Sequence, residues 1–181
     1  MPTLFLIAGH SLHDPGAVRA PFTEAELTRE LRRKLADRLR SAGATVCTDP
    51  DAKSLAELIP WVRERATPAD GLLSLHFNAA TPAATGSEVF VRQHYSGPEM
   101  TWAQNLAETT AQCLGRPNRG VKLEGQTRHG RLGILHSGPG TSALLEVAFL
   151  TNEADMAAYQ RHEQSLAERL SERLLNQFVL V

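Results

Sequence analysis

Two histidines and two glutamates stand where chemistry could be done. His10 and His76 each lie at the end of an apolar run, and Glu24 lies at the opening of a helical pattern. Glu146 lies within the apolar residues 142–150, where an ionised carboxylate is costly unless it is paired or bound to a metal. Two histidines and one glutamate form the ligand set of many catalytic zinc sites, which leave a fourth position for water. A further carboxylate outside that set could carry the proton of the water to a leaving amine.

Each of these side chains also has a structural interpretation. A histidine at a strand end is commonly a half-buried, hydrogen-bonded side chain. Glu24 could simply favour the positive end of a helix, and Glu146 could lie at the edge or the end of a sheet. Glu146 nevertheless suits a role as base, because apolar surroundings raise a carboxyl pKa toward the working pH. The four residues together favour the chemical interpretation more than any one of them does.

Apolar runs at residues 3–8, 44–48 and 71–79 predict buried strands. Helices are expected to begin at the N-cap residues Thr23 and Ser54, between these strands. The resulting order of strand, helix, strand, helix, strand favours a largely parallel sheet with right-handed crossovers. Ligands bind at the carboxyl ends of the strands in such sheets, which is where the third run ends in an imidazole and an amide.

The second half of the chain has a less regular pattern. Residues 87–93 alternate and predict a more exposed strand, whereas residues 115–131 predict an irregular loop. A short strand is expected at 132–135 and a strongly apolar strand at 142–150. Helices are expected at residues 98–114, from residue 151 onward and, as a final helix, at residues 163–178.

The composition is that of one globular domain. A chain of 181 residues with 42% apolar side chains predicts a single domain, residues 1–181. A formal net charge of −1 gives no electrostatic case for a nucleic-acid or membrane partner. The arginines between residues 29 and 40 are expected to form a solvated helix face. No stretch is long enough to span a bilayer, and the first apolar run is expected to be a strand rather than a signal peptide.

Four segments of the chain carry a resemblance to a known family. They are Gly9-His10 with Asp14-Pro15-Gly16-Ala17, then Glu24, then residues 74–79 around His76, and finally residues 145–152 around Glu146. In this order and at these separations, they resemble the motifs of the zinc-dependent N-acetylmuramoyl-L-alanine amidases of bacterial autolysins and phage endolysins. The resemblance covers nearly the whole chain.

The resemblance implies a zinc hydrolase. It implies that His10, Glu24 and His76 bind one Zn²⁺, and that Glu146 acts as general base and then as general acid. The substrate would be peptidoglycan, cleaved at the amide that joins N-acetylmuramic acid to the L-alanine of the stem peptide. The fold would be a single three-layer α/β/α domain around a mixed, largely parallel sheet of about six strands.

Three side chains are candidates for contact with the substrate. Asn78 could orient a ligand or touch the substrate, and a strand-end hydrogen bond is the alternative interpretation. Arg128 and Arg131 could bind carboxylates of the stem peptide, and a solvated loop is the alternative interpretation.

The chain departs from the family pattern just after its first histidine. The family often has two glycines at this place, whereas this chain has Ser11 and Leu12. His13 is consequently a rival ligand. We prefer His10, because it lies at the end of a strand and His13 lies within a loop.

Glu24 also has rivals as a ligand. Glu26 lies three residues after Thr23, so a capping box already offers it a structural role. Glu30 lies a further turn along the expected helix. Glu24 remains free to face a cation, and we prefer it for that reason.

Two other functions remain open from the sequence. Another zinc amide hydrolase, such as a carboxypeptidase or an N-acyl amino acid hydrolase, would need a cation fixed deep in its pocket for a terminal carboxylate. A cell-wall binding module without catalysis would need no zinc. The expected context is a monomer without a separate cell-wall-binding domain that acts at the cell wall, in the periplasm or outside the cell. Because no signal peptide is expected, either phage-type release or a trimmed secreted form fits this location.

Overall fold

A six-stranded sheet forms the centre of the computed structural model, which describes residues 1–178. The strand order is β4-β1-β5-β8-β6-β7. All neighbouring strands are parallel except β6 and β8, so the sheet is mixed and largely parallel, as predicted. The strands are β1 (Thr3–Ala8), β4 (Thr45–Thr48), β5 (Gly71–Asn78), β6 (Ser87–Val91), β7 (Asn118–Leu123) and β8 (Thr141–Phe149).

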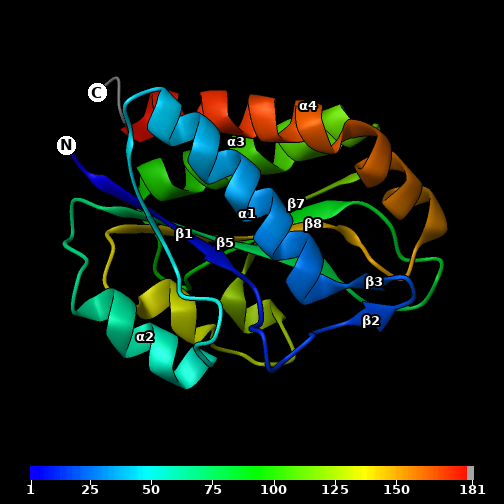
Figure 1. Ribbon diagram of the computed structural model, residues 1–181, viewed down its shortest axis with the longest axis horizontal. Coiled ribbons are helices and arrows are strands. Elements are labelled where there is room, and N and C mark those ends of the chain that lie inside the picture. The colour runs from blue at the N-terminus through cyan, green and yellow to red at the C-terminus, as the bar shows by residue number, and fades with distance from the viewer. Residues whose placement is uncertain (179–181) are drawn as a thin grey trace.

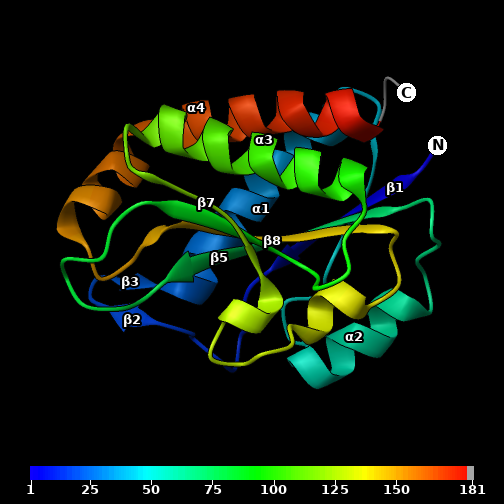
Figure 2. The same cartoon turned by 180° about the vertical axis from the view of Figure 1, so that it is seen from behind.

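Helices cover both faces of this sheet, which confirms the predicted three-layer arrangement. Figure 1 shows α1 (Glu24–Ser41), α3 (Gly97–Leu114) and α4 (Glu153–Phe178) on one face. The other face carries α2 (Leu55–Arg63) and two 3₁₀ turns, at Glu124–Gln126 and Gly133–His136, as the reverse view in Figure 2 also shows. Apolar side chains fill both interfaces, and the larger cluster lies beneath α1, α3 and α4. No helix within residues 1–178 is both long and apolar enough to cross a membrane.

Helix α1 begins where the capping pattern predicts. The Thr23 side chain accepts a hydrogen bond from the backbone N–H of Glu26 and donates one to the Glu26 carboxylate. The helix ends before Gly43, whose φ of 86° favours glycine. A small hairpin of β2 (Val18–Arg19) and β3 (Phe22–Thr23) leads into this cap. The cap occupies Glu26 and leaves Glu24, the first residue of the helix, for another role.

Arg32 does not lie on a solvated face, so that expectation is wrong for this residue. Its side chain is buried and forms ion pairs of 2.6 Å with Asp49 and of 2.6 Å with Asp51. The Asp49 carboxylate also accepts a 3.0 Å hydrogen bond from the backbone N–H of Ala8. This network ties α1 and the chain after β4 to the end of β1, two residues before His10.

Several expectations for the second half of the chain are wrong. Strand β6 is buried throughout rather than exposed, because it lies between β8 and β7. The expected loop at 115–131 contains the edge strand β7, and the expected strand at 132–135 is a 3₁₀ turn. Helix α4 is continuous, whereas the sequence predicted a helix start near residue 151 and a separate final helix.

Candidate metal centre

His10 lies in the loop that follows β1, with its ring fixed by an acid. Its φ of 69° is uncommon for a residue other than glycine, and such conformations cluster at functional sites. The Nδ1 atom lies 2.8 Å from Oδ2 of Asp14. This contact leaves Nε2 to face Glu24, 3.0 Å from its Oε2 atom. A carboxylate on the far side of a histidine ring is the arrangement that orients metal-binding histidines.

Glu24 brings the two histidines together. The side chain is buried, and its carboxylate accepts backbone hydrogen bonds from Ala17 (3.0 Å) and Phe77 (3.1 Å). One carboxylate oxygen faces His10, and the other lies 2.9 Å from Nδ1 of His76. The sequence produces this position because the capped helix α1 begins at Glu24, beside the ends of β1 and β5.

His76 completes a group of three possible metal ligands. It lies near the carboxyl end of β5, and its ring centroid is 5.5 Å from that of His10. One ligand atom from each of His10, Glu24 and His76 lies within 4.8 Å of the others. Two imidazole nitrogens and one carboxylate oxygen match the donor set of a catalytic zinc site.

The electrostatics of the group suit a cation. Burial opposes ionisation of Glu24, but hydrogen bonds with both imidazoles outweigh it and hold the pKa of this carboxyl well below its usual range. The hydrogen bond to Glu24 raises the pKa of His10 to about 9. The site therefore holds positive charge beside an ionised carboxylate. A bound metal ion would replace the proton that His10 and Glu24 share, and it would supply the positive charge in its place.

Two glycines make room for the histidine rings. A Cβ atom on Gly9 would lie 2.6 Å from Nδ1 and Cε1 of His76, and one on Gly16 would lie 2.5 Å from Cδ2 of His10. Real Cβ atoms do not approach other atoms so closely. Gly9 also holds its place by donating a backbone hydrogen bond of 2.8 Å to Leu75.

We expect Gly9→Ala to weaken metal binding. The added methyl group must push the His76 ring away from Glu24, because the backbone of Leu75 leaves it no other space. Zinc affinity should fall by about tenfold or more, a loss of about 1.4 kcal/mol. Zinc titration of the purified variant measures the change. Gly97→Ala is the matched control, since no atom lies within 4 Å of a Cβ there. Equal zinc affinities of the two variants would contradict this account of His76.

Glu146 lies directly beside His76 in the sheet. The two residues are Cα partners in the parallel pair of β5 and β8, so their side chains share a face. Strand β8 lies in the middle of the sheet, which excludes an edge position for Glu146. Its Oε2 atom is buried and has no hydrogen-bond partner among residues 1–178. Burial raises the pKa of Glu146 to about 7, which suits a group that gains and loses protons near neutrality.

Comparisons with known proteins agree with this geometry. The family model of the N-acetylmuramoyl-L-alanine amidases matches residues 4–176. The chain belongs to this family. The family is zinc-dependent, and its members hydrolyse peptidoglycan, so this amidase is an enzyme of cell-wall degradation.

Two curated relatives and two solved structures resemble the amidase. The uncharacterised protein YqiI of Bacillus subtilis is 25% identical over 172 residues, which cover 93% of this chain and 81% of the relative. The N-acetylmuramoyl-L-alanine amidase LytC of the same organism is 27% identical over 156 residues, 84% of this chain and 30% of LytC. An N-acetylmuramoyl-L-alanine amidase from Clostridium difficile 630 matches with a TM-score of 0.81 at 22% identity, over 97% of this chain and 95% of that one. The catalytic domain of the CD27L endolysin, which targets Clostridia difficile, matches with a TM-score of 0.78 at 26% identity, over 97% and 98%.

The three preferred candidate ligands lie together in the amidase, whereas their rivals lie elsewhere. His13 is exposed and lies outside the group of three, as do Glu26 and Glu30. Glu26 serves the helix cap, and Glu30 pairs with Arg33 on the surface of α1.

The candidate substrate contacts lie in two different places. The Asn78 side chain donates a 2.8 Å hydrogen bond to Glu88 and accepts one of 2.9 Å from the backbone N–H of Ala79. Arg128 and Arg131 are exposed in the loop between the two 3₁₀ turns, outside the group of three.

The sequence alone indicates no separate role for Asp14 or Glu88. Asp14 belongs to a turn pattern. Its spacing of four residues from His10 is the one feature that could have indicated a contact between the two side chains. Glu88 stood in a strand expected to be exposed, so nothing in the local pattern marked it as buried.

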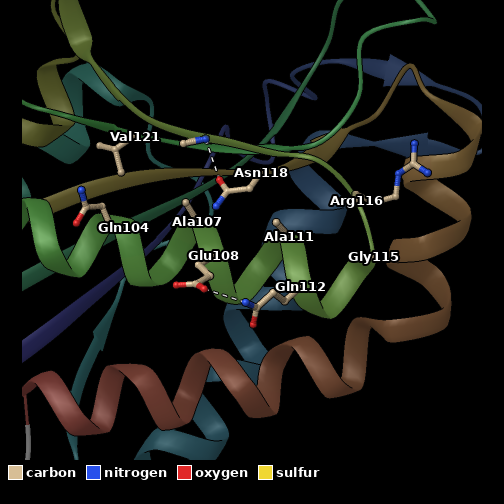
Figure 3. A pocket seen from close by; sticks show the side chains of 10 residues that line it. Gln104, Ala107, Glu108, Ala111, Gln112, Gly115, Arg116, Asn118 and Val121 are labelled. Atoms are coloured by element: carbon tan, nitrogen blue, oxygen red, sulfur yellow. Dashed lines mark hydrogen bonds between the residues drawn. The ribbon is translucent and has the colours of Figure 1, made fainter.

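The amidase has a separate groove of about 550 Å³ between α3 and β7. Figure 3 shows its lining, in which Gln112 donates a hydrogen bond to the Glu108 carboxylate. The Asn118 side chain accepts one from the backbone N–H of Gly120. None of the residues predicted for the site is among its lining residues. We therefore place the candidate site at the group formed by His10, Glu24 and His76, with Glu146 beside it.

Proposed function

We propose that His10, Glu24 and His76 hold one zinc ion with which this amidase cleaves the bond between the lactyl group of N-acetylmuramic acid and L-alanine. The observation that supports the proposal is the convergence of three possible ligand atoms beside Glu146, whose buried Oε2 atom has no hydrogen-bond partner among residues 1–178. Water adds across the amide: the hydroxyl goes to the carbonyl carbon, and the amine of L-alanine gains a proton as the C–N bond breaks.

The residues present fit a catalytic rather than a structural zinc site. Three protein ligands leave a position open, whereas structural sites are closed by four. When bound, zinc would supply a Lewis acid for the scissile carbonyl and would lower the pKa of water. Asp14 would hold the His10 ring so that Nε2 remains directed at the site.

Glu146 is the group that we propose to move the proton. Its buried Oε2 atom has no competing hydrogen bond among the described residues, so the carboxylate is free to accept a proton from water. The same carboxyl then donates this proton to the departing nitrogen. A pKa raised to about 7 by burial makes both transfers feasible near neutral pH.

The remaining assignments concern the substrate and the context. We propose that Asn78 helps to shape the site through its hydrogen bond with Glu88, and that Arg128 and Arg131 contact carboxylates of the stem peptide. Residues 1–181 would act as one catalytic domain, as a monomer, at the cell wall. Light scattering coupled to size-exclusion chromatography tests the oligomeric state.

Digestion of purified peptidoglycan tests the reaction. We expect new L-alanine amino termini, loss of this activity in a chelator, and recovery when zinc is added back. Release of free amino acids would instead support a carboxypeptidase. Absence of both products, with no zinc in the purified protein, would support a binding module without catalysis.

A further inference from the structure

A row of three polar side chains crosses the sheet at the candidate site. His76 on β5 is the Cα partner of Glu146 on β8, and Glu146 is the Cα partner of Glu88 on β6. Residues directly opposite one another on neighbouring strands point to the same face and lie within reach of each other. Two carboxyl groups therefore stand side by side, with a histidine next to one of them.

Glu88 has three donors around its carboxylate. It is 3% exposed, and it accepts hydrogen bonds from Asn78 Nδ2 at 2.8 Å and from Arg119 Nε at 2.6 Å. It also accepts a short hydrogen bond from Nζ of Lys122. Burial opposes the ionisation of Glu88, but the hydrogen bonds from Lys122 and Arg119 outweigh it and keep its pKa below the usual range.

Glu146 has a different environment, although it lies on the adjacent strand. Its Oε2 atom is buried and has no hydrogen-bond partner within the described chain. A buried carboxylate normally gains from a cation, and a cation close to it would form an ion pair. Two cations of β7, Arg119 and Lys122, both pair with Glu88, which is the partner of Glu146 on β6.

Lys122 is the cation with more freedom to change partners. Arg119 is held by stacking over the Phe149 ring, at 4.9 Å, as well as by Glu88. Lys122 is 29% exposed, and its ammonium group is positioned by the ion pair with Glu88. Lys122 is the register partner of Phe90, two residues along β6 from Glu88, so it shares the face of Glu88 and Glu146.

We propose that Glu88 is a positioning residue that binds Lys122 and Arg119 and so prevents these cations from pairing with Glu146. The inference rests on the proposed role of Glu146 as the base. An ion pair with Lys122 would occupy the lone pairs of Glu146 and turn its carboxylate away from the bound water and substrate. Glu88 thus keeps one carboxylate of the row available for proton transfer by engaging both cations itself.

A cycle of variants tests the inference. Glu88→Gln keeps the shape of the side chain but removes the charge that holds Lys122, and we expect kcat to fall about tenfold or more with KM and zinc content near those of the parent. Lys122→Met in the Glu88→Gln background removes the competing cation, and we expect it to restore most of kcat. Lys122→Met alone completes the cycle, so that the coupling between the two positions can be calculated.

The cycle separates this inference from a merely structural role. If Glu88→Gln loses activity and Lys122→Met does not restore it, or if Glu88→Gln retains full activity, the inference is wrong. Should Glu88→Gln fail to fold, Glu88→Asp with and without Lys122→Met gives the same comparison, because the shorter carboxylate withdraws from Lys122. Full activity of Glu146→Gln would instead overturn the proposed function on which the inference rests.

Discussion

Glu146→Gln is expected to reduce kcat for amide hydrolysis by about 10²–10⁴-fold, which is the range for loss of a general acid–base group. Glutamine has the shape of glutamate but cannot accept the proton of the attacking water. Glu146 is not among the proposed zinc ligands, so we expect zinc content to stay at one ion per chain. Turnover of purified peptidoglycan and metal analysis of the same preparation measure the two quantities.

The same substitution should not destabilise the fold. The pKa of Glu146 is about 7 in the folded protein against 4.5 for an ordinary glutamate. Ionisation therefore favours the unfolded chain, and stability is lost as the pH rises from 4.5 through 7. Glu146→Gln removes this cost, so we expect a Tm in chelator at pH 8 that is no lower than that of the parent. Glu64→Gln, at the exposed residue that follows α2, is the matched control for both measurements. Turnover at the parent rate would refute the role of Glu146 as base.

Glu24→Gln should largely abolish zinc binding. The substitution removes the one negative charge among the three proposed ligands. Glutamine has a single side-chain oxygen, so it cannot accept hydrogen bonds from His10, His76 and the backbone as the two carboxylate oxygens of Glu24 do. We expect zinc affinity to fall by more than about 100-fold, since loss of outer-shell partners alone costs 10–100-fold. Zinc stabilises only a protein that binds it, so the rise of Tm on zinc addition should also disappear.

The rival ligands provide the controls for this experiment. Glu30→Gln alters a carboxylate on the surface of the same helix, and His13→Ala removes an exposed imidazole three residues after His10. Both variants should keep their zinc and most of their activity. A Glu24→Gln protein that binds zinc as the parent does would show that the carboxylate is not a ligand.

Local patterns in the sequence were sufficient to predict the ends of elements at which the candidate ligands lie. The Thr23 cap predicted that α1 begins beside Glu24, and the two apolar runs predicted strands that end near His10 and His76. The ends of helices and strands depend on residues that are close along the chain. The spacing of apolar residues and the capping residues therefore reveal them.

Features that depend on strand order were not predictable in the same way. Strand β7 was missed because Asn118–Leu123 is polar at its start and contains Gly120 at a φ of 78°. The burial of Glu88 follows from the placement of β6 between β8 and β7 and from its pairing with cations that lie more than 30 residues away along the chain. Likewise, Glu146 lies beside His76 only because β8 pairs with β5, its neighbour in space but not in sequence.

An anomalous difference map recorded at the zinc absorption edge, from crystals of the zinc-loaded protein, tests the central claim most directly. We expect one peak, within about 2.0–2.2 Å of a nitrogen of His10, a nitrogen of His76 and an oxygen of Glu24. Glu146 should lie next to the metal without coordinating it. A peak bound through His13, Glu26 or Glu30, or no peak at the group formed by His10, Glu24 and His76, would contradict the account.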